Sequence, residues 1–232
     1  MWKIFDFLYL DGELDFEDPA PILAYAELAA ANDATRAWVL GEYYLFDGER
    51  YCEVESDAEK GLAWLTAAAQ LNPSLFATKL GDLFAEGKYL KADMVQALHW
   101  WEAAAQVDGG AAYFLSQRYQ KGQFVAKDTQ RALHWMQHGA HLGQVSCMNQ
   151  LASAYAMGEQ IEKDETLAIF WWEKAAKLEI SFAYKLAEIF LAGKLIKKND
   201  QKAIEWFQVA AKAGHTVSIQ KLERLGIKIE KP

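Results

Sequence analysis

Three histidines in the second half of the chain stand at spacings at which one helix can direct all three toward the same point. His134, His138 and His141 occupy positions i, i+4 and i+7, and Cys147 follows shortly after them. Because zinc in proteins prefers imidazole and thiolate ligands, a metal site is the chemistry that this cluster would support. Helical spacing alone does not specify such a site, and the chain has no HExxH, CxxC, GxSxG or glycine-rich phosphate loop. We therefore expect no catalytic residues, no cofactor and no metal, and the three histidines are the metal candidates that the sequence offers.

A histidine precedes a tryptophan twice, in the similar phrases ALHWWEAAA, which begins at residue 97, and ALHWMQHGA, which begins at residue 132. The tryptophan recurs at steps of 35 or 36 residues, at Trp64, Trp100, Trp135, Trp171 and Trp206. The histidine does not recur, because His99 and His134 correspond in the other copies to Ala63, Phe170 and Glu205. A position that accepts alanine, phenylalanine and glutamate is typical of a partly exposed helix flank and not of a ligand.

Each copy of the tryptophan is accompanied by other residues at fixed distances. Seven residues before it stand Asp57, Asp93, Asp128, Asp164 and Asn199. Alanine or glycine stands three residues before it and four and five residues after it. Farther upstream lies a second set, which begins with Leu40, Leu80, Leu115, Leu151, Leu186 and Leu222. The first five leucines are followed by a small residue, then by an aromatic at the fourth position, and three residues later by Asp47, Gly87, Gly122, Gly158 and Gly193.

These two sets predict a pair of helices in each copy. Leucine, small residue and aromatic at i, i+1 and i+4 form one face of a first helix. The glycine can adopt positive φ and end that helix, and the Asp or Asn can accept from free N–H groups as the N-cap of a second helix. Alanine, tryptophan and the small pair form the buried stripe of the second helix, with the tryptophan filling the space beside the small residues. Because no single pair can bury its own apolar face, the copies must stack into a solenoid.

The pattern AxxxLGxxYxxG…D…AxxWYxxAA closely resembles the Sel-one-like repeat, a relative of the tetratricopeptide repeat, and it covers roughly residues 2–226. The resemblance implies a right-handed α-solenoid that binds partners in a concave groove and has no chemistry of its own. The first full repeat departs from the pattern, since it has four extra residues between Asp47 and Asp57 and its loop around GERYCEVES should bulge. The cysteine pairs of the secreted, disulfide-held branch of the family are absent.

We therefore expect an all-α fold, a right-handed α-solenoid of about six helix-turn-helix repeats of 35–36 residues with a C-terminal capping helix. It would form a single domain over residues 1–232. The expected repeat units are about 2–32, 33–72, 73–108, 109–143, 144–179 and 180–214, followed by the capping helix at 215–226.

Composition and charge limit the classes of partner. The hydrophobic fraction of 52% excludes a disordered chain, and the net charge of −8 argues against nucleic-acid binding. Residues 1–60 hold 15 acidic against 4 basic residues, so the chain has an acidic end. No apolar run approaches the length of a membrane span, and the first residues lack the pattern of a secretory signal. We therefore expect a cytoplasmic protein that binds neither nucleic acid nor membrane.

By analogy with tetratricopeptide geometry, the first helices should line the concave face, at positions two before and two and six after each repeat leucine. The partner-binding residues expected on this basis are Trp38, Glu42, Phe46, Thr78, Asp82, Glu86, Tyr113, Gln117, Lys121, Asn149, Ser153, Met157, Tyr184 and Glu188. The segment from Trp38 to Glu86 combines aromatic rings with carboxylates, which favours a partner with a basic surface. The alternative is that Trp38 and Phe46 only pack on neighbouring helices.

The leading functional hypothesis is a non-enzymatic scaffold or adaptor that binds another protein in its concave groove. An alternative is an immunity protein that neutralises a secreted or contact-delivered bacterial toxin by direct binding. Small, acidic repeat proteins of this family resemble such immunity proteins. An enzyme or a binder of a cell-wall ligand is the third hypothesis, with only the histidine cluster and an aromatic groove in its favour.

Overall fold

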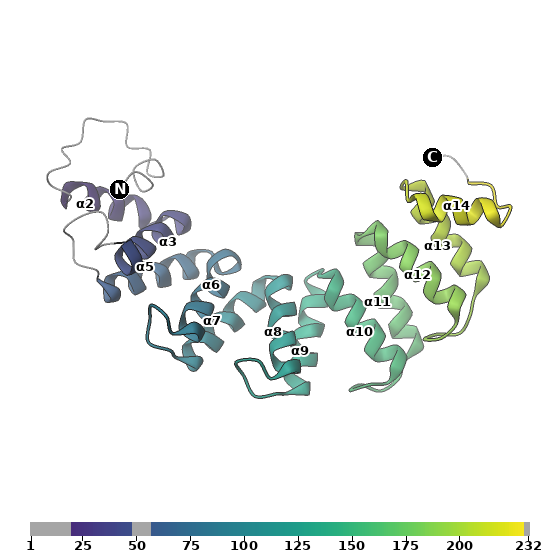
Figure 1. Ribbon diagram of the computed structural model, residues 1–232, viewed down its shortest axis with the longest axis horizontal. Helices are drawn as coiled ribbons and strands as arrows, with labels where there is room; N and C mark the ends of the chain where they lie inside the picture. Colours follow the sequence, from purple (N-terminus) through teal and green to yellow (C-terminus); the bar gives the residue numbers. More distant parts are fainter. Residues whose placement is uncertain (1–19, 48–56, 230–232) are drawn as a thin grey trace. The chain divides into compact units, whose positions relative to one another are not determined.

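The computed structural model describes residues 20–47 and 57–229, and within these ranges it contains helices and no strand (Figure 1). The first helix of the first predicted repeat and the loop GERYCEVES lie outside the described residues. The described α-helices are α2 (Ala20–Ala30), α3 (Ala34–Glu42), α5 (Ala58–Leu71), α6 (Pro73–Glu86), α7 (Met94–Val107), α8 (Gly109–Lys121), α9 (Thr129–His141), α10 (Val145–Met157), α11 (Glu165–Leu178), α12 (Ile180–Ala192), α13 (Asp200–Lys212) and α14 (Thr216–Arg224). A π-helical turn, η1 (Tyr43–Asp47), continues α3.

The helices form two compact units, unit 1 over Met1–Ala111 and unit 2 over Ala112–Pro232, and the division falls within α8. In unit 1, α3 packs on α5 and α6 packs on α7. In unit 2, α10 packs on both α9 and α11, α12 on α11 and α13, and α14 on α13. Helices that follow one another in sequence therefore pack in consecutive pairs, and the predicted all-α solenoid of repeats is confirmed. The single domain with its repeat boundaries stays a prediction.

The N-cap of each second helix is the predicted acidic or amide residue. Oδ1 of Asp93 accepts from the backbone N–H groups of Val95 and Gln96 at 2.9 and 3.1 Å. Asp57, Asp128, Asp164 and Asn199 cap α5, α9, α11 and α13 in the same way. These bonds satisfy donors that the helix itself leaves without a partner, so the prediction of the caps is confirmed.

The cap residue also ties the second helix to the first. In every full repeat, its backbone N–H donates to the carbonyl oxygen of the repeat aromatic. In the first full repeat Asp57 donates to Tyr44 at 3.1 Å, and in the last Asn199 donates to Phe190 at 3.0 Å. The first full repeat makes this bond despite its extra residues, so its longer connection returns to the same point of the first helix.

Glycine ends the first helix as predicted. Gly87, Gly122, Gly158 and Gly193 have φ between 64° and 71°, a region that other residues adopt at a cost. At Gly87 and Gly193 a side chain would also collide, because an added Cβ would lie 2.7 Å from the Cβ of Ala92 or Lys198. The glycine is therefore required at these two positions both by backbone conformation and by the closeness of the next segment.

The space beside the small residue of the first helix is filled by the residue after the repeat tryptophan, and not by the tryptophan itself. An added Cβ on Gly81 would lie 2.5 Å from the Trp101 ring, and one on Gly41 would lie 2.7 Å from Leu65. The position after the repeat tryptophan holds Leu65, Trp101, Met136, Trp172 and Phe207, which are all buried, whereas Trp64 and Trp206 are only half-buried. The sequence interpretation had the repeated tryptophans fill the space beside the small residues, and at Gly41 and Gly81 the following residue fills it instead.

Candidate partner-binding surface

In unit 1, the predicted binding residues of α3 and α6 surround a pair of stacked rings. Trp38 and Phe76 lie with ring centroids 5.0 Å apart and planes 16° from parallel. Trp38 is 6% exposed, so its ring packs on the neighbouring helix and presents almost no apolar area to a partner. Nζ of Lys79 lies 5.6 Å from the Trp38 ring and 5.4 Å from the Phe76 ring, which shows that this aromatic face accepts a cation.

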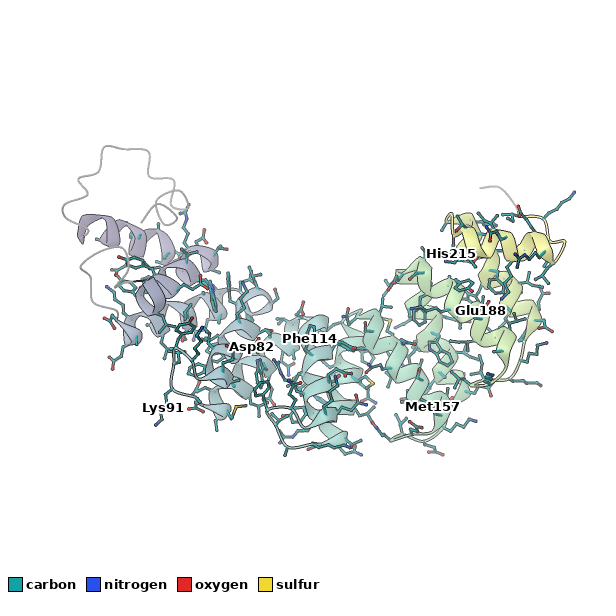
Figure 2. The ribbon with its side chains drawn as sticks, in the orientation of Figure 1. Asp82, Lys91, Phe114, Met157, Glu188 and His215 are labelled. Atoms are coloured by element: carbon teal, nitrogen blue, oxygen red, sulfur yellow. The ribbon has the colours of Figure 1, made fainter. Side chains whose placement is uncertain are left out.

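Two carboxylates of this surface are held by indole groups. Nε1 of Trp38 donates to Oε1 of Glu42 at 2.8 Å, within one turn of α3. Nε1 of Trp101, which reaches over from α7, donates to Oδ1 of Asp82 at 2.9 Å (Figure 2). Both carboxylates are half-buried. The indole bonds fix the orientation of Glu42 and Asp82, so their charges have set positions on the surface.

The remaining predicted residues of unit 1 lie on α6 or in η1. Glu86 is exposed at the end of α6, and Thr78 is half-buried in the middle of the same helix. Phe46 lies in η1, but its side chain is outside the described part of the chain. The described surface of unit 1 is therefore acidic, with one lysine above its aromatic pair.

In unit 2, most of the predicted polar residues bond to one another or to the core. Nε2 of Gln117 on α8 donates to Oε1 of Gln150 on α10 at 3.1 Å, and Gln150 in turn donates to the Tyr113 hydroxyl at 3.5 Å. Asn149 accepts at 3.1 Å from Nε1 of Trp172, and Ser153 donates to the carbonyl oxygen of Asn149 at 2.9 Å. These bonds connect α8 to α10 and α10 to α11.

Helices α12 and α14 are joined by a ring contact and an ion pair, which involve His215 and Glu188, both labelled in Figure 2. The Tyr184 ring of α12 lies 4.8 Å from the ring of His215, the N-cap of α14, and 5.8 Å from the Phe207 ring. Glu188 on α12 forms an ion pair with Lys221 on α14. Lys121 and Met157 are the exposed members of the predicted set in unit 2, each at the last residue of its helix.

One position of the surface was missed by sequence reasoning, namely the residue before the repeat leucine. At this position Lys79 covers the aromatic pair, Gln150 bonds to Gln117, Lys221 pairs with Glu188, and Phe114 is 60% exposed. The helical period could have found it, because the position before the leucine and the sixth position after it differ by only about 20° around the helix axis.

The histidine cluster packs on tryptophan rings. His134 and His138 both lie edge-on to Trp135, with centroids 5.2 and 5.8 Å apart, while His141 lies edge-on to Trp171 of the next second helix at 5.2 Å. Within residues 20–47 and 57–229, no three histidine, cysteine, aspartate or glutamate side chains are grouped so that they could hold a metal ion. His99 and His134 are exposed, which confirms the interpretation of their position as a helix flank.

The thiol of Cys147 is buried in α10, and burial raises its pKa to about 12. The thiol therefore stays protonated near neutral pH, and its place is a packing position. Among the helices that the structure describes, none combines the length and the apolar character needed to cross a lipid bilayer.

Comparison with protein families and solved structures gives a consistent result. A family model described as the Sel1 repeat matches residues 37–73, 75–107, 110–144, 145–179 and 180–215. A search of curated proteins found no match. A Sel1 repeat protein from Oxalobacter formigenes is 27% identical with a TM-score of 0.57, and the match covers 90% of this chain and 60% of that chain.

Two further solved structures share less sequence. The protein c5321, described as a protective antigen present in uropathogenic Escherichia coli strains displaying an SLR fold, is 23% identical with a TM-score of 0.60. That match covers 90% of this chain and 45% of the other, so this chain spans less than two thirds of the length of both proteins. Immunity protein Pa5087 from Pseudomonas aeruginosa is 15% identical with a TM-score of 0.43, over 90% of this chain and 80% of that one. A similarity of this size carries no functional argument, and the immunity hypothesis stays a prediction.

Proposed function

Because the chain belongs to the Sel1 repeat family, we propose that it is a non-enzymatic module that binds another protein through the first helices of unit 1. Sel1 repeat proteins generally mediate protein–protein interaction. The observation that carries the proposal for this chain is the pair of carboxylates, Glu42 and Asp82, that tryptophan N–H groups hold on the surface of α3, α6 and α7.

A carboxylate in a fixed orientation is a suitable acceptor for the lysine or arginine of a partner. An ionised carboxylate offers about four acceptor positions, so the bond from Trp38 orients Glu42 and still leaves it able to accept from a partner. Because the side chain is already ordered, less conformational entropy is lost on binding. The position of Lys79 above the Trp38–Phe76 pair supports the proposal that a basic group can lie against this surface.

The charge of the chain favours the same partner. The acidic excess of residues 1–60 would attract a basic protein from solution and raise the rate of association. We therefore propose that the partner presents a basic surface or segment.

The test uses variants that remove charge and retain the hydrogen-bond acceptor. The double variant E42Q/E86Q keeps an oxygen for the Trp38 N–H, and the matched control E59Q/E102Q removes two charges from the second helices α5 and α7. With each protein immobilised in native lysate at low salt, we expect partners bound by the wild type to be lost by E42Q/E86Q and retained by E59Q/E102Q. The readout is mass spectrometry, and equal capture by both variants would contradict the proposal.

A further inference from the structure

The second helices of unit 2 carry a row of mostly exposed side chains beside the repeat tryptophans. Relative to the repeat tryptophan, the row occupies the positions one before and three, six and seven after. We call these residues of α9, α11 and α13 the second-helix stripe. They are His134, His138, His141 and Leu142, then Phe170, Lys174, Lys177 and Leu178, and last Glu205, Val209, Lys212 and Ala213.

The stripe is open to solvent and mixes basic with apolar groups. Every member is exposed except His138, which is half-buried. Phe170 and Leu178 are 44% and 61% exposed, and Lys174 and Lys177 lie on the same helix. Glu205 is the one carboxylate among these positions.

Two contacts link neighbouring second helices of unit 2 beside the stripe. The His141 ring at the end of α9 lies 5.2 Å from Trp171 on α11. Glu173 on α11 forms an ion pair with Lys202 on α13 at 3.7 Å. On α11 itself, Nζ of Lys174 lies 4.8 Å from the Phe170 ring, so cation and ring form one local surface.

Unit 1 shows that the fold does not require basic residues at these positions. The same four positions of α5 and α7 are held by Ala63, Ala67, Gln70, Leu71, His99, Ala103, Gln106 and Val107. Neither helix has a lysine or arginine there, yet both pack like their counterparts in unit 2. Among the second helices that the structure describes, lysine occurs at these positions only on α11 and α13.

Helix electrostatics explain part of the pattern and leave the rest. His138, His141, Lys177 and Lys212 lie in the last turns of their helices, where a positive charge interacts favourably with the helix dipole. Lys174 lies outside the last turn of α11, and the dipole gives no reason for Phe170 and Leu178 to face solvent. Exposed apolar side chains beside lysines offer a partner both apolar and ionic contacts.

We propose that the second-helix stripe of unit 2 binds an acidic, amphipathic segment of another protein. Lys174, Lys177 and Lys212 would receive carboxylates of that segment, while Phe170 and Leu178 would contact its apolar side chains. Charge complementarity selects an acidic occupant, and the interspersed apolar residues select one with an apolar face. This surface is separate from the carboxylates of unit 1 and has the opposite charge preference.

The experiment measures the affinity of a fluorescein-labelled model peptide of about 20 residues, composed of glutamate, leucine and phenylalanine in an amphipathic helical pattern. We expect the wild type to bind it, and the triple variant K174Q/K177Q/K212Q to bind on the order of ten-fold more weakly at low salt, since three charge pairs are lost. The matched control K127Q/K163Q/K198Q removes the same charge from exposed lysines in the loops between first and second helices and should bind within about two-fold of the wild type.

A second variant separates the apolar contribution from the charge. L178S should weaken peptide binding several-fold and leave the salt dependence of the affinity unchanged. The triple lysine variant should make the affinity less dependent on salt. Circular dichroism of all variants shows whether the fold is retained, which we expect because every substituted side chain is exposed.

Three outcomes would overturn the proposal. The first is that the wild type does not bind the acidic peptide, or binds the matched glutamine peptide equally well. The second is an equal loss of affinity in K127Q/K163Q/K198Q, which would show attraction by net charge alone. The third is that vesicles of phosphatidylserine and phosphatidylcholine bind the stripe and displace the peptide, which would identify an anionic membrane as the occupant.

Discussion

At the scale of single residues, one ionic cluster fastens α2 to the rest of unit 1. The Tyr44 hydroxyl donates to Oε1 of Glu27 at 2.8 Å, Lys60 forms an ion pair with the same carboxylate, and Nζ of Lys60 lies 4.6 Å from the Tyr44 ring. Burial acts to raise the pKa of Glu27, but the hydrogen bonds from Lys60 and Tyr44 and the charge of Lys60 outweigh it, and the pKa is lowered. Three elements, α2, η1 and α5, meet at this carboxylate.

The lowered pKa gives a pH-dependent contribution to stability. A carboxyl whose folded pKa lies below its unfolded value stabilises the fold above the unfolded pKa and loses that contribution as the pH falls through the folded one. We expect E27Q to cost about 0.5 kcal/mol at pH 7, a value kept small because both side chains are partly exposed. The difference between wild type and E27Q should shrink below pH about 4.5. Urea unfolding of both proteins across this range checks the prediction, and a difference that does not vary with pH would contradict it.

At the scale of helices, the residue after the repeat tryptophan and the small residue of the first helix form a matched pair. The contact is direct for Gly41 with Leu65 and for Gly81 with Trp101, and the same two positions hold Ser116 and Met136, Ala152 and Trp172, and Ala187 and Phe207 in the later repeats. In the first two, an added Cβ would lie under 3.0 Å from the partner side chain. Both members of a pair therefore determine how closely α3 approaches α5 and how closely α6 approaches α7.

This pairing predicts a specific rescue between α6 and α7. Gly81→Ala places a methyl group 2.5 Å from Cδ1 of Trp101, and we expect it to destabilise the fold by about 1–3 kcal/mol despite the better helix propensity of alanine. Adding W101M should recover part of the loss, because methionine stands at the same position, Met136, in the repeat whose first helix has Ser116 in place of glycine. Denaturant unfolding of the single and double variants gives the coupling free energy. Strictly additive effects would contradict the pairing.

The sequence predicted those features that depend on local chemistry. Asp93 as a cap and Gly87 as a helix end follow from properties of single residues, and the structure confirms both. The deep-core position after the tryptophan could not be predicted in this way, because leucine, tryptophan, methionine and phenylalanine all occupy it and no repeated letter marks it. The bonds that orient Glu42 and Asp82 were equally out of reach, since the second one joins residues of two helices.

At the scale of the whole molecule, the two surfaces differ in charge and lie in different units. Residues 1–60 hold 15 acidic and 4 basic residues, whereas residues 61–232 hold 17 acidic and 20 basic. The carboxylates of α3 and α6 belong to unit 1, and the second-helix stripe belongs to unit 2. If both proposals hold, the chain would bind a basic partner through unit 1 and an acidic partner through unit 2, as an adaptor does.

This arrangement predicts that the two surfaces bind independently. The two surfaces share no residue and belong to separate compact units, so changes at one surface should leave the other unaffected. We expect E42Q/E86Q to bind the acidic model peptide within about two-fold of the wild type, and K174Q/K177Q/K212Q to capture the same basic partners as the wild type. Fluorescence anisotropy and lysate capture with the same set of proteins measure both quantities. A change of affinity at the second surface after substitution of the first would show that the surfaces are coupled, and the protein would then regulate its partners' binding and not merely bring them together.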